Sequence, residues 1–234
     1  MFKLRKAKER GHTKLNWLDS WHTFSFDTYY DPEYEHFGPL RVINDDIVGP
    51  GTGFPTHSHR DMEILTYVLE GELSHKDSLG NGSTIVPGEL QYMSAGKGIQ
   101  HSEYNPSAEN LVRLLQIWIM PNKEGLSPHY DQKAFNIKYG GGWQLIASAD
   151  GREKSIRINQ DVLLYATKLN SGEQVQYKIA PGRKVWLQIA EGHLNCNNNE
   201  MFGGDGASLS DLDLVDIKAS NQSHLLLFDL PANI

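Results

Sequence analysis

The sequence predicts an all-β protein made of two antiparallel β-barrels. Three observations support this fold class: short runs of strand-forming residues fill most of the chain, Gly, Pro, Asn and Asp separate these runs, and the two halves share a faint repeat. No comparably long stretch places its apolar residues at helical spacing. Many short antiparallel strands with frequent turns are typical of a barrel or a sandwich.

The predicted strands are runs rich in β-branched, aromatic and other apolar residues. In chain order they cover residues 40–45, 63–75, 83–88, 89–96, 111–120, 143–148, 163–169, 175–182, 185–195 and 223–231. The LGNG stretch at 79–82 combines Gly and Asn in the way that a tight hairpin turn requires. It therefore predicts an antiparallel pair formed by the strands on either side of it.

The internal repeat consists of two pairs of segments that occur in the same order in each half. YVLEGEL at 67–73 resembles LQIAEGHL at 187–194, and LLQIWIMP at 114–121 resembles HLLLFDLP at 224–231. Two copies of one β-barrel would produce this pattern.

We therefore expect two domains of similar fold. The first is predicted at residues 1–135 and the second at 136–234, and the polar, turn-rich segment 120–135 is the predicted connection between them. A chain of 234 residues, of which 39% are hydrophobic, is long enough to bury the cores of two such domains.

The charge balance argues against nucleic acid as a general partner. The formal net charge is −7, whereas binding to phosphate backbones needs clustered Lys and Arg. The one basic run, FKLRKAKERGH at 2–12, is interpreted as a solvated terminal segment.

Cysteine content and hydropathy favour the cytoplasm. Cys196 is the single cysteine, so no intramolecular disulfide can form, and its neighbours offer no base that would make it a nucleophile. No apolar segment follows the basic start as in a secretory signal, and no run of 18 apolar residues could span a bilayer. We expect a cytoplasmic protein with no membrane partner.

Two pairs of metal-ligand residues are the most informative feature of the sequence. His57 and His59 lie two residues apart in PTHSHRDM, and His101 and Glu103 have the same spacing in GIQHSEYN. Side chains at positions i and i+2 of a strand point to the same face. If both strands line one barrel, three imidazoles and a carboxylate converge on one point, and nearby glycines in GTGF and GKG allow the backbones to approach closely.

Such a mixed nitrogen and oxygen site suits one divalent first-row transition metal. Fe(II), Mn, Co, Ni, Cu and Zn all accept these ligands, and four protein donors in an octahedral shell leave two positions open, as catalytic metals require. Alternation along a strand does not decide whether the carboxylate comes from Glu103 or from Glu63, since both lie an even number of residues from a histidine. The remaining histidines lack a paired ligand at this spacing and are interpreted as structural: His12, His22, His36, His75, His129, His193 and His224.

The same residues carry a family resemblance. GTGFPTHSHRDME, which contains Gly51, His57, His59 and Glu63, resembles the first metal motif of cupins, and the stretch from Gly88 to Asn105 approximates the second. HSHRDMEILTYVLEGELSHKDSLGN and MSAGKGIQHSEYNPS resemble the pirin family, and ERGHTKLNWLDSWHTFSFDTYYDP with RVINDD is similar to bacterial pirin-like quercetin dioxygenases. The likeness covers nearly the whole chain.

The chain departs from the general cupin pattern in three places. Seven residues rather than six separate Glu63 from Gly71, and SAGKG replaces the usual proline before the second-motif glycine. The C-terminal half has no HxH motif, so we expect no metal there.

The pirin resemblance implies a bicupin with two barrels face to face and a metal in the N-terminal barrel alone. It implies His57, His59, His101 and Glu103 as the metal ligands, with Glu103 preferred to Glu63 and serving also as a candidate catalytic base, and iron(II) as the preferred metal. The implied activity is that of a quercetin 2,3-dioxygenase, in which O₂ opens the central ring of a flavonol with loss of CO.

Two further expectations accompany this assignment. Animal pirins are interpreted as metal-dependent partners of transcription factors, so a metal-gated regulatory or redox-sensing protein is the alternative function. We also expect a monomer, because two barrels that cover each other's sheets need no additional partner surface.

Overall fold

The computed structural model describes residues 1–232 and is almost entirely β. In this part of the chain the helical segments are two 3₁₀ turns, η1 (Ala7–Glu9) and η2 (Arg152–Lys154). The predicted all-β class is therefore confirmed. No helix within residues 1–232 is long and apolar enough to cross a membrane.

The chain divides into two compact units. The N-terminal unit comprises residues 11–135 and 158–160, and the C-terminal unit comprises residues 1–10, 136–157 and residue 161 onward. The sequence did not predict that residues 1–10 belong to the C-terminal unit or that residues 158–160 belong to the N-terminal unit. Residues 1–10 join the C-terminal unit because their strand β1 (Phe2–Arg5) pairs with β20 (Gly206–Leu209), a contact between positions about 200 residues apart that no local pattern encodes.

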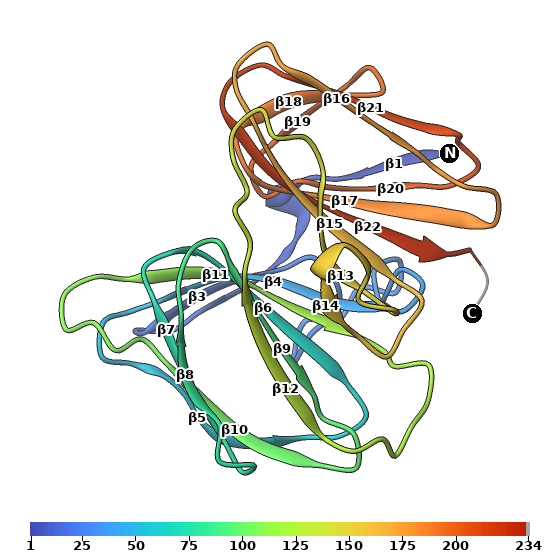
Figure 1. The fold of residues 1–234 in the computed structure, drawn as a ribbon. Helices are drawn as coiled ribbons and strands as arrows, with labels where there is room; N and C mark the ends of the chain where they lie inside the picture. The colour runs from blue at the N-terminus through green and yellow to red at the C-terminus, as the bar shows by residue number, and fades with distance from the viewer. Residues whose placement is uncertain (233–234) are drawn as a thin grey trace. The chain divides into compact units, whose positions relative to one another are not determined.

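The N-terminal unit consists of two facing sheets (Figure 1). The seven-stranded sheet has the order β12 (His129–Ala134), β9 (Glu89–Ser94), β6 (Glu63–Glu70), β11 (Val112–Ile119), β4 (Leu40–Val48), β3 (Leu18–His22) and β2 (Gly11–Lys14). The four-stranded sheet has the order β5 (Gly53–His59), β10 (Ile99–Tyr104), β7 (Leu73–Asp77) and β8 (Gly82–Ile85).

The C-terminal unit repeats this arrangement (Figure 1). Its seven-stranded sheet has the order β1, β20, β17 (Arg183–Glu191), β22 (Ser223–Pro231), β15 (Leu163–Leu169), β13 (Gln144–Ser148) and β14 (Ile156–Arg157). Its four-stranded sheet has the order β16 (Gln174–Lys178), β21 (Leu214–Ala219), β18 (His193–Cys196) and β19 (Asn199–Phe202).

The sequence repeat falls on equivalent strands of the two units. YVLEGEL runs from β6 to the start of β7, and LQIAEGHL runs from β17 into β18. LLQIWIMP lies on β11 and HLLLFDLP on β22. β11 lies between β6 and β4, just as β22 lies between β17 and β15. The central strands of the two halves therefore share one topology, whereas β14 pairs with β13 in parallel and the edge strand β1 comes from the start of the chain.

Each unit is a two-sheet jelly roll and not a closed barrel, so the expectation of barrels is corrected in this detail. The seven-stranded and four-stranded sheets are separate in their hydrogen bonding. Two twisted sheets that pack face to face bury their inner apolar faces without closing the ladder. In the N-terminal unit, Val68 and Leu114 from one sheet meet Leu73 and Ile85 from the other in this core.

The hairpin turn predicted at LGNG is confirmed. It connects β7 to β8, and the Asp77 carboxylate accepts backbone hydrogen bonds from Leu79 and Asn81 at 2.9 and 3.0 Å. The other edge of β7 pairs with β10, which carries two of the candidate metal ligands.

Candidate metal centre

The two ligand pairs lie on adjacent strands of the four-stranded sheet. β5 carries His57 and His59, β10 carries His101 and Glu103, and the antiparallel register places His101 directly opposite His57. Gly53 makes this close pairing possible, since a Cβ at that position would lie 2.2 Å from the Glu103 carbonyl oxygen. The alternation of side chains along each strand and the glycine in GTGF therefore act together to bring the two ligand pairs onto one face of the sheet.

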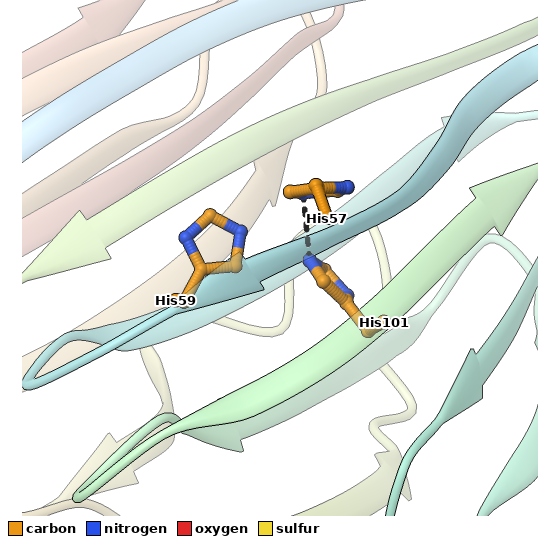
Figure 2. Close-up of side chains that lie close together, drawn as sticks. All are labelled: His57, His59 and His101. Atoms are coloured by element: carbon orange, nitrogen blue, oxygen red, sulfur yellow. Dashed lines mark hydrogen bonds between the residues drawn. The ribbon is translucent and has the colours of Figure 1, made fainter.

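The three histidines converge (Figure 2). The His57 and His101 rings are 4.4 Å apart between centroids, His57 and His59 are 4.7 Å apart, and His59 and His101 are 4.9 Å apart. Each residue offers a nitrogen within 4.8 Å of the nitrogens of the other two. This geometry is compatible with one ion held by all three imidazoles.

Burial keeps two of these imidazoles neutral. Burial, together with the smaller effect of the neighbouring histidines, lowers the pKa of His59 to about 4 and that of His101 to about 3. A metal ligand must present a lone pair, so a low pKa prepares both rings for coordination at neutral pH.

The hydrogen bonding of the cluster fits a bound cation. His57 Nδ1 donates to the Pro55 carbonyl at 2.8 Å, which directs the His57 Nε2 lone pair toward His101 Nε2, 3.0 Å away. Two neutral imidazoles that face each other through these nitrogens can share only one proton. A cation between the rings would accept the Nε2 lone pairs of both His57 and His101.

Glu103 is buried beside this cluster and is held by the opposite sheet. Thr66 Oγ1 and Gln91 Nε2 donate to its Oε1 at 3.1 and 2.9 Å, and Gln116 Nε2 donates to its Oε2 at 2.9 Å. Its carboxylate forms a second candidate group with His101 and His75. His101 is therefore the residue that joins Glu103 to the other two predicted ligands.

His75, which the sequence indicated was structural, lies within this second group. Its Nε2 pairs with Asp77 at 3.3 Å, its ring stacks on Tyr130 at 4.8 Å, and its buried Nδ1 has no hydrogen-bond partner within residues 1–232. The register of β7 against β10 sets His75 opposite Glu103. Spacing along the chain gives no sign of this cross-strand contact.

The alternative carboxylate, Glu63, is fully buried and engaged elsewhere. It accepts hydrogen bonds from the Tyr92 hydroxyl, from Ser94 Oγ at 2.8 Å and from the backbone N–H of Asn159 at 2.8 Å. Its neighbour Ile64 lines the cavity at the histidines, so Glu63 points to the other face of β6.

The histidine cluster opens into a cavity of about 270 Å³ in the N-terminal unit. Aromatic side chains form much of its wall: Trp17 packs edge-on against Phe54 at 5.2 Å, and Trp118 packs edge-on against Phe26 at 5.4 Å and against His59 at 5.0 Å. The wall also carries a polar patch of Ser20, His22, Asn44 and Asp46, a set that the sequence did not identify. The cavity can take a flat aromatic molecule with polar substituents.

The remaining sequence expectations concern side chains away from the cluster. His12 pairs with Asp19 at 2.8 Å and His193 with Glu200 at 2.8 Å, so both have ordinary partners. Burial raises the pKa of Cys196 to about 12, which leaves no thiolate to act as a nucleophile.

The low histidine pKa values predict how the metal-free protein responds to acid. The folded pKa values of His59 and His101 lie below the unfolded value near 6.5, so the unfolded chain binds protons more readily. These two groups therefore destabilise the fold as the pH falls from about 6.5 to about 4 for His59 and to about 3 for His101. We expect their imidazole NMR resonances to remain those of neutral rings at pH 5.5. Titration of both rings near pH 6.5 would contradict this expectation.

Comparison with known proteins agrees with this geometry. A family model described as Pirin matches residues 3–119, and a model described as Quercetinase C-terminal cupin domain matches residues 145–230. The quercetin 2,3-dioxygenase of Escherichia coli (strain K12) is 50% identical over 231 residues, which cover 99% of each chain.

Solved structures give the same result. The crystal structure of YhhW from Escherichia coli superposes with a TM-score of 0.96 at 49% identity, over 100% of this chain and 99% of that one. The structure of bacterial pirin YhhW in complex with nickel(II) superposes with a TM-score of 0.95 at 49% identity, over 100% of both chains. The chain belongs to the pirin family.

Proposed function

We propose that this protein is a metal-dependent dioxygenase that acts on a flavonol such as quercetin. The observation that carries the proposal is the cluster of His57, His59 and His101 in the wall of a cavity that aromatic side chains also line. The 50% identity to a protein named quercetin 2,3-dioxygenase supports the reaction class. Ring opening with release of CO is the proposed outcome.

His57, His59, His101 and Glu103 are the proposed ligands of one divalent metal, with Fe(II) as the preferred ion. The converging imidazoles and the buried carboxylate offer the mixed donor set that first-row metals favour. The related bacterial pirin YhhW forms a complex with nickel(II), which supports a divalent metal as the ligand. When bound, the metal supplies Lewis acidity and the means to engage O₂.

The protein's own contribution is to position the substrate and to keep water away. Trp17, Phe54 and Trp118 offer faces and edges on which aromatic rings can pack, with the substrate's oxygen-bearing central ring directed toward the histidines. Thr66, Gln91 and Gln116 fix the Glu103 carboxylate, so its orientation does not depend on solvent.

Incubation with flavonols in the presence and absence of oxygen tests this function. Protein loaded with a single metal should consume the flavonol absorption band in air, in proportion to metal occupancy, and should leave it unchanged under anaerobic conditions. CO should appear in the headspace in step with that loss. Absence of turnover with each of Fe, Mn, Co, Ni, Cu and Zn would favour the regulatory alternative.

We predict one metal per chain, held by the N-terminal unit. Within residues 1–232 both candidate ligand groups lie in that unit, and the pair of His193 with Glu200 in the C-terminal unit supplies only two donors. Metal analysis should give a ratio near one for wild type and for His193→Ala. A ratio near two that falls to one in His193→Ala would show a second site.

A cytoplasmic monomer remains our proposal for the state in the cell. The single cysteine, Cys196, is buried and free, as suits a reducing compartment. Sedimentation at micromolar concentration should give the mass of one chain, and a stable dimer would overturn the proposal.

A further inference from the structure

The reaction proposed above requires that a flavonol hydroxyl lose its proton in the cavity. Glu103 is poorly suited to accept this proton, because Thr66, Gln91 and Gln116 already donate hydrogen bonds to both of its oxygens. These hydrogen bonds occupy three of the roughly four lone-pair positions of the carboxylate, and the proposed metal would take the fourth. The geometry of Glu103 is that of a hydrogen-bond acceptor that is fixed in place.

The other acid–base groups that line the cavity leave one candidate. Both nitrogens of His22 are engaged, Nδ1 with Asn44 Oδ1 and Nε2 with Thr13 Oγ1, each at 2.9 Å. Asp27 is exposed at the rim, where water competes for any proton. Asp46 is buried and lines the same cavity as the histidine cluster.

Asp46 lies on β4, on the sheet that faces the histidine-bearing strands. One oxygen accepts a hydrogen bond from Ser20 Oγ on the adjacent strand β3. Burial raises the pKa of Asp46 to about 7; the Ser20 hydrogen bond opposes this shift, and the carboxylates of Asp45 and Glu103 reinforce it. A base with a pKa near the working pH is effective in proton transfer.

We propose that Asp46 is the catalytic base that takes the proton from the substrate hydroxyl, an inference that rests on the proposed function. The O–H bond of the flavonol breaks, its proton forms a new O–H bond with the Asp46 carboxylate, and the electron pair remains on the flavonol oxygen. No oxidant or reductant takes part in this step. Ser20 holds the carboxylate in position and is a positioning residue.

The test is an anaerobic titration of metal-loaded protein with quercetin, followed by absorption spectroscopy. A flavonol that has lost its hydroxyl proton absorbs at longer wavelength, so wild type should develop this band at pH 7. Asp46→Asn should bind quercetin within a few-fold of wild type in equilibrium dialysis, but the band should be weak. Its kcat in air should fall about 10²- to 10⁴-fold, as is typical when a general base is removed.

Asp45→Asn is the matched control. Asp45 is the neighbouring carboxylate on β4, its side chain points to the opposite face, and it pairs with Arg113 at 3.0 Å outside the cavity. This variant keeps the proposed base and should still develop the band, with the acidic limb of its kcat/KM profile moved slightly to lower pH because the Asp45 carboxylate raises the pKa of Asp46. Ser20→Ala removes the hydrogen bond that lowers the pKa of Asp46, so the acidic limb of its kcat/KM profile should move to higher pH.

The outcomes separate this inference from the proposed function. An Asp46→Asn variant with full metal content that develops the wild-type band and turns over normally would overturn the role of Asp46 and leave the dioxygenase proposal intact. Wild-type protein that fails to bind quercetin in dialysis would overturn both. Thermal melting of each variant distinguishes loss of the base from loss of the fold.

Discussion

Replacement of Glu103 by alanine should weaken metal binding by more than about 10- to 100-fold and should abolish flavonol turnover. A loss of about 10- to 100-fold is typical when a residue that hydrogen-bonds to a metal ligand is replaced. The change removes the proposed carboxylate ligand and leaves Thr66, Gln91 and Gln116 with unsatisfied buried donors. Metal content after dialysis and oxygen-dependent loss of the flavonol band measure the two effects. Glu103→Gln keeps the volume, loses the charge and should share the metal defect.

The contrary outcome is specific. If Glu103→Ala keeps its metal and Glu63→Ala loses it, the carboxylate ligand is Glu63 and the site is that of an ordinary cupin. The positions of the two side chains make this result unexpected, because Glu103 lies beside His101 whereas Glu63 points to the other face of its strand.

Glu63→Ala should instead destabilise the fold and retain the metal. The carboxylate is fully buried, and its removal leaves the Tyr92 hydroxyl, the Ser94 hydroxyl and the Asn159 N–H without their acceptor. Each buried polar group left unsatisfied costs about 1–3 kcal/mol, so we expect a loss of at least about 3 kcal/mol. For a chain of this length that loss lowers the Tm by roughly 6–12 °C.

Thermal melting and metal analysis of the same preparation test this prediction. Glu63→Gln provides the control, because its amide oxygen can still accept one or two of these hydrogen bonds and its volume is nearly unchanged. It should melt between wild type and Glu63→Ala. A Glu63→Ala protein that melts with wild type would mean that the hydrogen bonds to this carboxylate contribute little net stability.

The fold class and most of the central strands could be read from the sequence because their signals are local. Strand-forming runs, the turn at 79–82 and the repeat of β6 and β11 in β17 and β22 all lie within short windows of the chain. The strands that the sequence missed include β1 and β20. These strands are short and owe their stability to pairing with distant partners.

The convergence of His57, His59 and His101 was also predictable, since two alternating pairs need only share one sheet face. The sequence did not predict which residues surround these histidines. His75 approaches His101 through the register of β7, Glu103 is held by side chains from β6, β9 and β11, and Asp46 lines the cavity from β4.

The sequence by itself thus determined which residues can bind a metal and that the two members of each pair share one strand face. The tertiary structure alone decided that Glu103 is held by three donors, that Glu63 points away from the cavity and that Asp46 is buried beside it. The physical reason is that side-chain alternation is a property of one strand, whereas hydrogen bonds and burial across a sandwich depend on the register of strands far apart in the chain.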